Sequence, residues 1–239
     1  MASPLSFFEK LHSLHRAWRY RLNSEKESIR FLHSQNLLDK TALDIGGNFG
    51  VYSYWMSKLV GKQGKVVTFE PQPELAEYLE SLRISFQLDN MIIVNKALSA
   101  LPGKQDLYRQ KIGDGGASLT DDAVVERKSI PVDVSTLDEY FSGWAGPKIE
   151  FIKCDVEGHE LEVFKGGRSV LLKDFPSLLF ECHQINADQG DVFSFLESLG
   201  YDGFFLSDGQ KIHFSRFNDY PYPKPGVSHR NYIFVRKEV

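Results

Sequence analysis

The amino-acid sequence predicts an α/β domain built on a mostly parallel β-sheet, with a helical segment in front of it. Two observations lead to this fold class. From residue 41 onward, short apolar runs alternate with longer amphipathic segments, and turns rich in glycine and acidic residues follow several of the apolar runs. Such alternation is typical of parallel strands joined by helices that cover both faces of a sheet. Ligands of these folds bind outside the carboxyl ends of the strands, where the turns are expected.

Residues 1–38 are predicted to form a helical extension, and residues 39–239 the domain itself. The extension carries apolar side chains near helical spacing, namely Leu5, Phe8, Leu11, Leu14 and Trp18. This pattern predicts an amphipathic helix whose apolar side packs on the domain. The alternative is an organelle transit segment, because residues 1–23 carry four lysines or arginines and a single acid.

The first half of the domain follows the alternation closely. Strands are predicted over 41–45, 65–69 and 91–94, and helices over 51–60 and 73–87. Pro73 suits the first turn of its helix, because an N–H group at that position would have no partner within the helix.

The alternation breaks between residues 96 and 134. Segments 104–110 and 127–134 have strand character, and the loop 113–118 between them contains three glycines. We interpret this region as a hairpin insertion that replaces a helix, with the loop as a lid over the ligand site. The alternative is a plain surface hairpin.

The second half resumes the alternation and then ends in antiparallel strands. Helices are predicted over 136–141, 158–172 and 190–199, and strands over 149–154 and 177–183. Apolar runs at 204–206 and 211–214 flank a turn sequence and predict a hairpin, and 231–237 supplies a last strand.

Composition narrows the functional classes. The chain has 239 residues, a net charge of −4 and a pI near 6.0, so no nucleic-acid partner is expected. No apolar run approaches the roughly 20 residues of a membrane span. Cys154 and Cys182 lie in apolar strand-like runs. We therefore expect buried thiols, no disulfide framework and a cytoplasmic protein.

The turn after the first strand has the composition of a nucleoside-binding loop. A dinucleotide-binding motif, G-x-G-x-x-G, needs glycine at its first, third and sixth positions. Counted from Gly46, the third position is Asn48 and the sixth is Val51, so the motif is not present here. The form D-x-G-x-x-x-G fits instead, with Asp44, Gly46 and Gly50. The spacing therefore argues against a nicotinamide-dependent oxidoreductase.

An acid follows the second predicted strand. Glu70, followed by Pro71, lies 20 residues after Gly50. A carboxylate at this strand tip can accept a hydrogen bond from each of two ribose hydroxyls. The alternative is a glycine turn that only packs strand against helix, with Glu70 capping the next helix. The loop and the acid together favour a nucleoside site.

A second group of polar residues follows the strand 149–154. It contains Asp155, Glu157, His159 and Glu160 within six residues. Asp155 comes directly after the strand and is expected to point into the crevice at the reactive end of the ligand. Glu160 is expected to face solvent, and Glu157 could simply cap the next helix.

These motifs resemble the FkbM-family methyltransferases over roughly residues 40–236. The resemblance rests on Asp44-Ile-Gly-Gly-Asn-Phe-Gly50, on Phe69-Glu-Pro71 and on the block Ile152–Gly166, which contains Asp155-Val-Glu-Gly158. It implies a Rossmann-like class I methyltransferase fold with a mostly parallel seven-stranded sheet and an antiparallel C-terminal hairpin. It also implies S-adenosylmethionine as cofactor and transfer to hydroxyl oxygens. Gly47 departs from the family pattern, in which alanine is more usual at that position.

The resemblance assigns provisional roles. Asp44 would hold the cofactor ammonium and Glu70 the ribose. The expected cofactor-binding residues are Asp44, Gly46, Gly47, Asn48, Gly50, Glu70, Pro71 and Asp155. A hydroxyl acceptor must lose a proton, so a base within hydrogen-bond reach is expected. The expected catalytic residues are Asp155, His159, Glu181 and His183, and Glu157 is a further base candidate.

The acceptor is expected to be a small molecule or a glycan, since known substrates of the family include natural products and sugars. Asp155, Glu157 and Glu181 could converge on Mg²⁺, but their spacing does not require it, and no metal is expected. A cofactor-binding scaffold without turnover is the rival hypothesis. The sequence does not determine the oligomeric state or the role of residues 1–38.

Overall fold

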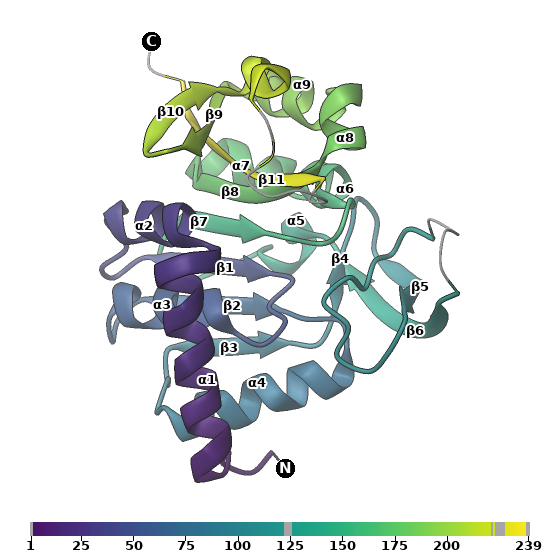
Figure 1. Ribbon diagram of the computed structural model, residues 1–239. Helices are drawn as coiled ribbons and strands as arrows, with labels where there is room; N and C mark the ends of the chain where they lie inside the picture. Colours follow the sequence, from purple (N-terminus) through teal and green to yellow (C-terminus); the bar gives the residue numbers. More distant parts are fainter. Residues whose placement is uncertain (1, 122–125, 221, 223–227, 238–239) are drawn as a thin grey trace.

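A mixed β-sheet with helices on both faces forms the body of the molecule (Figure 1). The structure is a computed structural model that describes residues 2–121, 126–220, 222 and 228–237. The strands of the main sheet are β1 (Thr41–Ile45), β2 (Lys65–Phe69), β3 (Met91–Val94), β7 (Ile149–Cys154), β8 (Ser177–His183), β9 (Tyr201–Ser207), β10 (Gln210–His213) and β11 (His229–Arg236). Their order is β10-β9-β11-β8-β7-β1-β2-β3.

Five strands of this sheet, β3, β2, β1, β7 and β8, run parallel to their neighbours in that order. β11 is antiparallel to both β8 and β9, and β10 is antiparallel to β9. The predicted mostly parallel sheet and the C-terminal hairpin are therefore confirmed. Among the described residues the sheet has eight strands, whereas seven were predicted. Both strands of the hairpin belong to the sheet, and β10 forms its edge.

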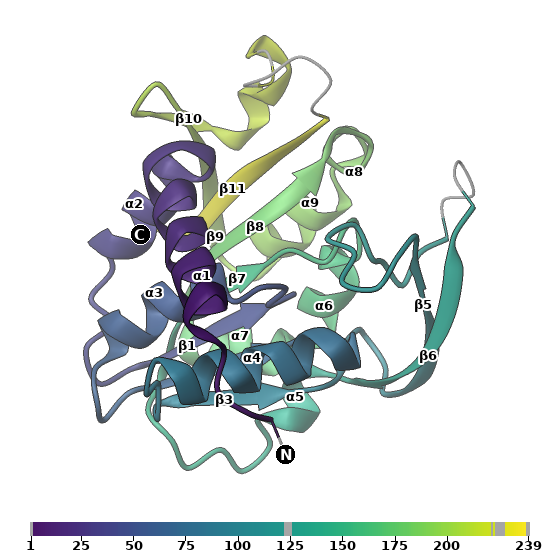
Figure 2. The ribbon, with the colours of Figure 1, turned by 60° about the horizontal axis from the view of Figure 1, so that its bottom comes forward.

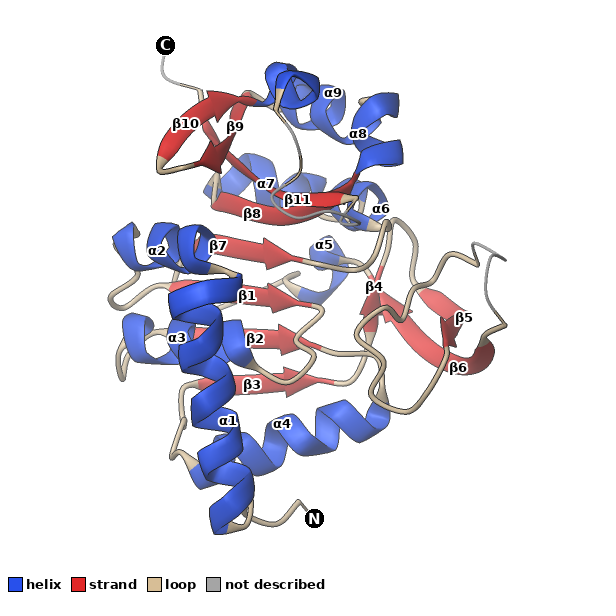
Figure 3. Ribbon diagram, in the orientation of Figure 1, coloured by secondary structure: helices blue, strands red, loops and turns tan. Residues whose placement is uncertain are grey.

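The helices divide between the two faces of the sheet, as Figures 1 and 3 show. On one side lie α1 (Phe7–Arg19), a π-helical turn (Tyr20–Ser24), α2 (Lys26–Ser34), α3 (Val51–Val60) and α4 (Pro73–Ser85). On the other lie α5 (Leu137–Tyr140), α6 (Glu160–Lys165), α7 (Arg168–Asp174), α8 (Gln184–Gln189) and α9 (Asp191–Ser198). Successive strand residues serve opposite faces. Ala42 and Val66 join the core beneath α2 and α3, whereas Leu43 and Val67 join the core beneath α5 to α9.

The predicted helix over 158–172 is wrong in one respect, because the structure divides it into α6 and α7. A Cβ on Gly166 would lie 2.1 Å from the backbone oxygen of Ser99, and a Cβ on Gly167 would lie 2.7 Å from Leu137. The chain therefore turns where its backbone is pressed against two distant segments. Nothing in the local spacing of apolar residues indicates this contact.

The insertion forms a separate three-stranded sheet from β4 (Ala97–Leu98), β5 (Gly103–Arg109) and β6 (Lys128–Ser135). β5 and β6 are antiparallel, which confirms the predicted hairpin. Figure 2 shows the hairpin standing off the end of the main sheet. The described part of the loop after β5 returns to the body of the molecule, since the Ser118 hydroxyl donates a 2.9 Å hydrogen bond to the backbone oxygen of Glu157.

The N-terminal helix packs differently from the prediction. α1 faces α3 through the small residues Ser13 and Ala17, and the Trp55 indole N–H donates a 3.2 Å hydrogen bond to the backbone oxygen of Ala17. Of the apolar side chains that were expected to pack on the domain, only Leu5 is buried and Leu14 is half-buried, whereas Phe8, Leu11 and Trp18 are exposed. Small side chains let the two helices approach closely, which turns the large ones outward. Among the described residues, no helix has the length and apolar character needed to cross a bilayer.

Candidate active site

The glycine loop between β1 and α3 is held against the ends of the two neighbouring strands. Gly46 has φ +79°, and a Cβ there would lie 1.9 Å from the backbone oxygen of Asp155. A Cβ on Gly47 would lie 2.3 Å from the Thr68 side chain. Gly50, at φ +73°, caps the start of α3 and lines neither of the two cavities described below. The glycines of this loop therefore serve its packing, and Gly46 and Gly47 also border one or both of the two cavities described below.

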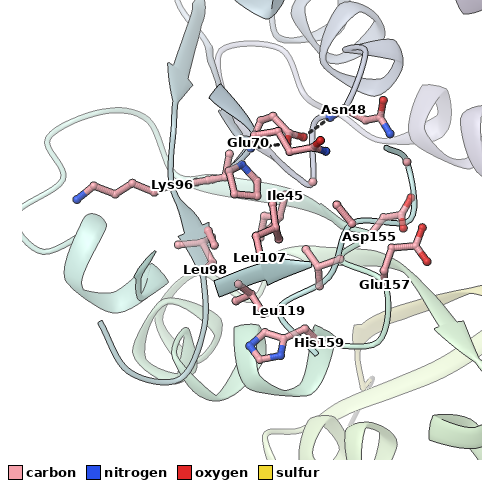
Figure 4. A pocket seen from close by; sticks show the side chains of 18 of the residues that line it. Ile45, Asn48, Glu70, Lys96, Leu98, Leu107, Leu119, Asp155, Glu157 and His159 are labelled. Atoms are coloured by element: carbon pink, nitrogen blue, oxygen red, sulfur yellow. Dashed lines mark hydrogen bonds between the residues drawn. The ribbon is translucent and has the colours of Figure 1, made fainter. Parts of the chain in front are cut away.

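Glu70 is joined to the glycine loop by direct hydrogen bonds. Its Oε2 accepts a 2.7 Å bond from the backbone N–H of Asn48, and its Oε1 accepts a 2.9 Å bond from that of Gln72 (Figure 4). Burial raises the pKa of Glu70 to about 7, although these two hydrogen bonds act to lower it. A carboxylate has about four acceptor sites, so each oxygen can still accept a further bond from a ligand hydroxyl.

Asp44 is buried at the end of β1 with one oxygen unsatisfied. The Ser53 hydroxyl donates a hydrogen bond to Oδ2, whereas Oδ1 has no partner among the described residues. Burial raises the pKa of Asp44, and the nearby Lys153 ammonium acts in the opposite direction. A buried carboxylate oxygen without a partner is costly unless a donor or a cation reaches it. This arrangement fits the ammonium group of an amino-acid ligand.

Two cavities meet at this loop. The first is a slot of about 60 Å³ with apolar walls that include Ile45, Phe69, Leu98, Leu107 and Leu119, and Figure 4 shows Glu70 at its rim. The second is a polar groove of about 430 Å³ lined by residues that include Arg16, Tyr20, Glu25, Asp44, Tyr52, Lys153, Glu181, His229 and Asn231. Both cavities are bordered by Gly46, Asn48, Gly115, Asp155 and Glu157. Asp155 thus lies at the junction between an apolar and a charged compartment.

Asp155 is paired with a buried lysine. The Lys153 ammonium donates a 3.0 Å hydrogen bond to Oδ2 of Asp155. Burial acts to lower the pKa of Lys153, but the carboxylates of Asp155 and Asp44 outweigh it and raise that pKa above its usual value. Lys153 therefore stays charged and anchors Asp155. Among the described residues, Oδ1 of Asp155 makes no hydrogen bond and is free to accept one.

Two carboxylates pair with two histidines where β7 and β8 end and β11 begins. His183 Nε2 lies 3.2 Å from Oε2 of Glu157, and His229 Nδ1 lies 3.4 Å from Oε1 of Glu181. Burial and the nearby Asp155 and Glu157 charges raise the pKa of Glu181 to about 9. The hydrogen bond to Glu157 raises the pKa of His183, whereas burial lowers that of His229.

Donor atoms of this region also approach one another closely enough for a metal ion. In the described part of the chain, atoms of Glu181, His183 and His229 lie within 4.8 Å of one another, as do atoms of Asp155, Glu157 and Glu181. Each of the two histidines is already paired with a carboxylate, so these side chains have partners without a metal ion.

One sequence-based expectation about the block after β7 needs correction. Glu160 does not face solvent: it is 2% exposed, and its Oε1 accepts hydrogen bonds from the backbone N–H groups of Val156 and Gly158. Burial raises the pKa of Glu160 to about 7. His159 lies in the slot, 2.9 Å from the Ser99 hydroxyl, and does not line the groove with Glu181 (Figure 4). The side chain of Glu160 therefore closes the turn. His159 shares the slot with Asp155 and Glu157 but does not border the groove that Glu181 lines.

Several groove residues escaped the sequence analysis. Oε2 of Glu25 accepts a 2.6 Å hydrogen bond from the Asn231 side chain and a 3.2 Å bond from the Tyr52 hydroxyl. Asn231 and His229 belong to the final strand, whose proximity to the C-terminal ends of β7 and β8 follows only from the antiparallel return of the chain. Glu25 lies in the N-terminal extension, where no local pattern marks it.

Comparisons with known proteins find relatives among methyltransferases. A sequence model of the FkbM methyltransferase domain matches residues 44–202. The hexuronic acid methyltransferase AglP of Haloferax volcanii is 28% identical over 162 residues, which cover 67% of this chain and 64% of AglP. The methyltransferase sdnD of Sordaria araneosa is 24% identical over 189 residues, covering 67% of this chain and 73% of sdnD.

A solved structure shares the fold. The crystal structure of the methyltransferase FkbM from Methylobacillus flagellatus superposes with a TM-score of 0.56 at 14% identity, over 97% of this chain and 56% of that one. The chain therefore spans less than two thirds of the length of AglP and of this structure. The span matched by the family model includes the glycine loop, Glu70, Asp155 and His183, and leaves α1, α2 and β11 outside it.

Proposed function

The chain belongs to the FkbM methyltransferase family, and on that premise we propose that it transfers the methyl group of S-adenosylmethionine to a hydroxyl oxygen of a sugar or another small polyhydroxylated molecule. The observation that carries the proposal is the unpartnered Oδ1 of Asp44, buried at the end of β1 beside the loop that Glu70 holds. A buried anion at one end of the loop and a ribose acceptor at the other match the two polar ends of this cofactor.

The two cavities suit the two parts of the cofactor. The slot offers apolar walls for the adenine ring, with Glu70 and Pro71 at the position expected for the ribose. Asp44 would hold the ammonium group from the groove side. When bound, the cofactor supplies a methyl group on a positively charged sulfur. Asp155 borders both cavities, which supports its expected place beside the reactive end.

We assign Asp155 as the proton acceptor for the incoming hydroxyl. Lys153 fixes one of its oxygens and leaves the other available within the groove. With the cofactor bound, the sulfur–methyl bond would break as the oxygen–methyl bond forms and leave a neutral thioether, and Oδ1 of Asp155 would take the proton of the acceptor hydroxyl. The chain otherwise acts by holding the reactants in line in a site from which water is largely excluded.

The groove provides the polar groups that hydroxyl-rich acceptors need. Glu181, His229 and Asn231 line it, and the Glu157–His183 pair stands beside it. Side chains of these types donate and accept hydrogen bonds with sugar hydroxyls. The similarity to AglP, a hexuronic acid methyltransferase, supports the same substrate class. Cys154 and Cys182 are free and buried, which supports the proposal of a reducing cytoplasmic location.

Calorimetry and a labelling assay together test the proposal. We expect the purified protein to bind S-adenosylmethionine and S-adenosylhomocysteine, and to transfer labelled methyl from the former into uronic-acid-containing glycans or other sugars. Asp44→Asn should weaken binding, because the buried anion is lost. Absence of binding to either compound would overturn the proposal. Binding without transfer to any fraction of a cell extract would favour a cofactor-binding scaffold, and binding of a nicotinamide dinucleotide instead would favour an oxidoreductase.

A further inference from the structure

The N-terminal helix presents an apolar stripe to solvent. Along α1 and the π-helical turn, five large side chains are between 47% and 79% exposed: Phe7, Phe8, Leu11, Trp18 and Leu22. At 100° per residue the positions within α1 fall on one side of the helix, away from the small residues that face α3, and Leu22 follows in the π-helical turn. Trp18 lies at the edge of this stripe, where one side of its ring packs edge-on against Trp55 of α3. In the described part of the chain, these five exposed large hydrophobic residues are gathered on α1 and the turn that follows it. Single hydrophobic residues scattered over a surface are common, but a continuous exposed stripe indicates an interaction site.

Cationic side chains border this stripe on both sides. By the same helical spacing, Lys10 and Arg21 flank one edge, and Arg19 flanks the other. Within the described residues, none of Lys10, Arg19 and Arg21 forms an ion pair with a carboxylate. Residues 1–24 carry four lysines or arginines and one acid, although the whole chain has a net charge of −4. Three of these four basic residues, Lys10, Arg19 and Arg21, therefore border the apolar stripe of a protein that is acidic as a whole.

We propose that α1 is an interfacial helix that docks the protein onto an anionic lipid bilayer. A helix with a solvent-facing apolar stripe and flanking cations lies in the interface plane, with its apolar side among the acyl chains and its cations among the headgroups. Trp18 suits this boundary because its ring is amphipathic. The inner side of the same helix carries Arg16, which lines the groove, so the docking surface adjoins the proposed acceptor site.

The positive side chains beside the stripe indicate which kind of partner it binds. A second copy of this chain would bring the same positive side chains together, which is unfavourable, whereas an anionic surface neutralises them. The interaction should therefore weaken as salt is raised, because screening at high ionic strength shortens the range of the attraction. The inference does not depend on the proposed methyl transfer, since the test below uses the protein without cofactor or acceptor.

Vesicle co-sedimentation tests the inference. One set of vesicles is pure phosphatidylcholine, and the other contains about one third phosphatidylserine. We expect binding to the second set at low salt, with the tryptophan fluorescence shifting to shorter wavelength as the Trp18 ring leaves water, a shift that Trp18→Phe should remove. The triple variant Phe8→Ser, Leu11→Ser, Leu22→Ser should reduce partitioning at least about 100-fold, given the apolar area removed. Lys10→Glu with Arg19→Glu should reduce it about tenfold or more.

A matched control removes exposed leucines elsewhere. Leu38 and Leu101 are 62% and 73% exposed and lie outside α1, so Leu38→Ser with Leu101→Ser should bind vesicles as the wild type does. The inference is overturned if the wild type fails to bind anionic vesicles, or if binding survives the triple substitution. It is also overturned if the wild type sediments as a dimer that the same triple substitution dissociates, because the stripe would then belong to a second copy.

Discussion

The backbone oxygen of Asp155 lies where a side chain on Gly46 would begin. Only 1.9 Å separates that oxygen from the Cβ position of Gly46. The loop proposed to hold the cofactor and the turn that carries the proposed proton acceptor are therefore in direct backbone contact. Because the two segments share a contact surface, a change in one must move the other.

Gly46→Ala is expected to destabilise the protein strongly. The new methyl group would overlap a backbone atom, and an alanine at φ +79° is strained besides. Gly143→Ala is the matched control, because Gly143 has φ +73° with no atom within 4 Å of its Cβ position. We expect a cost of about 1 kcal/mol for the control and at least about 3 kcal/mol for Gly46→Ala. Urea unfolding measures both, and equal losses would show that the contact with Asp155 is unimportant.

Cofactor affinity should depend on pH through Glu70. Its pKa is raised to about 7 by burial, and ribose hydroxyls donate to the ionised carboxylate. Binding should therefore strengthen as the pH rises through 7, with an affinity at pH 6 about tenfold weaker than at pH 8. Calorimetric titration with S-adenosylhomocysteine across this range measures the effect. Glu70→Gln should bind more weakly with a nearly flat profile, and an unchanged slope in that variant would assign the titration to another group.

Glu160 should make folding stability depend on pH. Its pKa is about 7 in the folded protein against an ordinary value of 4.5, so the protonated form favours the folded state. The resulting stability is fully present below pH 4.5 and is lost as the pH rises through 7. Glu160→Gln, which keeps an oxygen for the two backbone N–H groups, should reduce the loss between pH 4.5 and pH 8 by about 3 kcal/mol. Parallel stability curves for wild type and variant would contradict this.

Asp155→Asn should impair turnover far more than cofactor binding. Loss of a positioned base costs about 10²–10⁴-fold in rate, whereas the cofactor pocket keeps Asp44 and Glu70. His159→Asn provides the comparison. Because His159 lies in the slot, its substitution should lower the rate of methyl transfer by less than about tenfold. Single-turnover kinetics with a labelled cofactor separates the two steps. If His159→Asn proved the more damaging change, the assignment of Asp155 would be wrong.

Metal removal should leave the activity unchanged within about twofold, since methyl transfer needs no Lewis acid when a base is in place. Glu157 and Glu181 already pair with His183 and His229, so the cluster does not depend on a cation. Assays with a chelator and with added Mg²⁺ or Mn²⁺ measure this. A large loss with the chelator that either ion restores would place a metal among Glu181, His183 and His229.

The amino-acid sequence was sufficient for features that depend on neighbouring residues. The spacing of Asp44, Gly46 and Glu70 identified the strand ends and the loop, because a strand, a tight turn and a helix each have a local pattern. Asp155 was placed correctly at a strand end for the same reason. The break at Gly166 was missed, since it depends on contacts with distant segments. The strand β10 was predicted as part of the hairpin, but the predicted count of seven strands was one too few.

The orientation of α1 shows the same limit in another form. Its apolar periodicity predicted a helix but could not say which side faces the domain, and Ser13 and Ala17 rather than Phe8 and Leu11 make the contact. The spacing of apolar residues shows that a helix has an apolar and a polar side. Packing against a particular neighbour decides which side is buried. Close approach to α3 favoured the small side chains.

By itself, the sequence determined the fold class, the position of the glycine loop and the acid that follows the second strand, because these are encoded in short stretches of chain. Only the tertiary structure decided that Glu25, His229 and Asn231 border one groove with Asp155, and that His159 does not. It also decided that Glu160 is buried and that the stripe on α1 is exposed. The physical reason is that side chains far apart in the chain meet through strand order and helix packing, which no local spacing specifies.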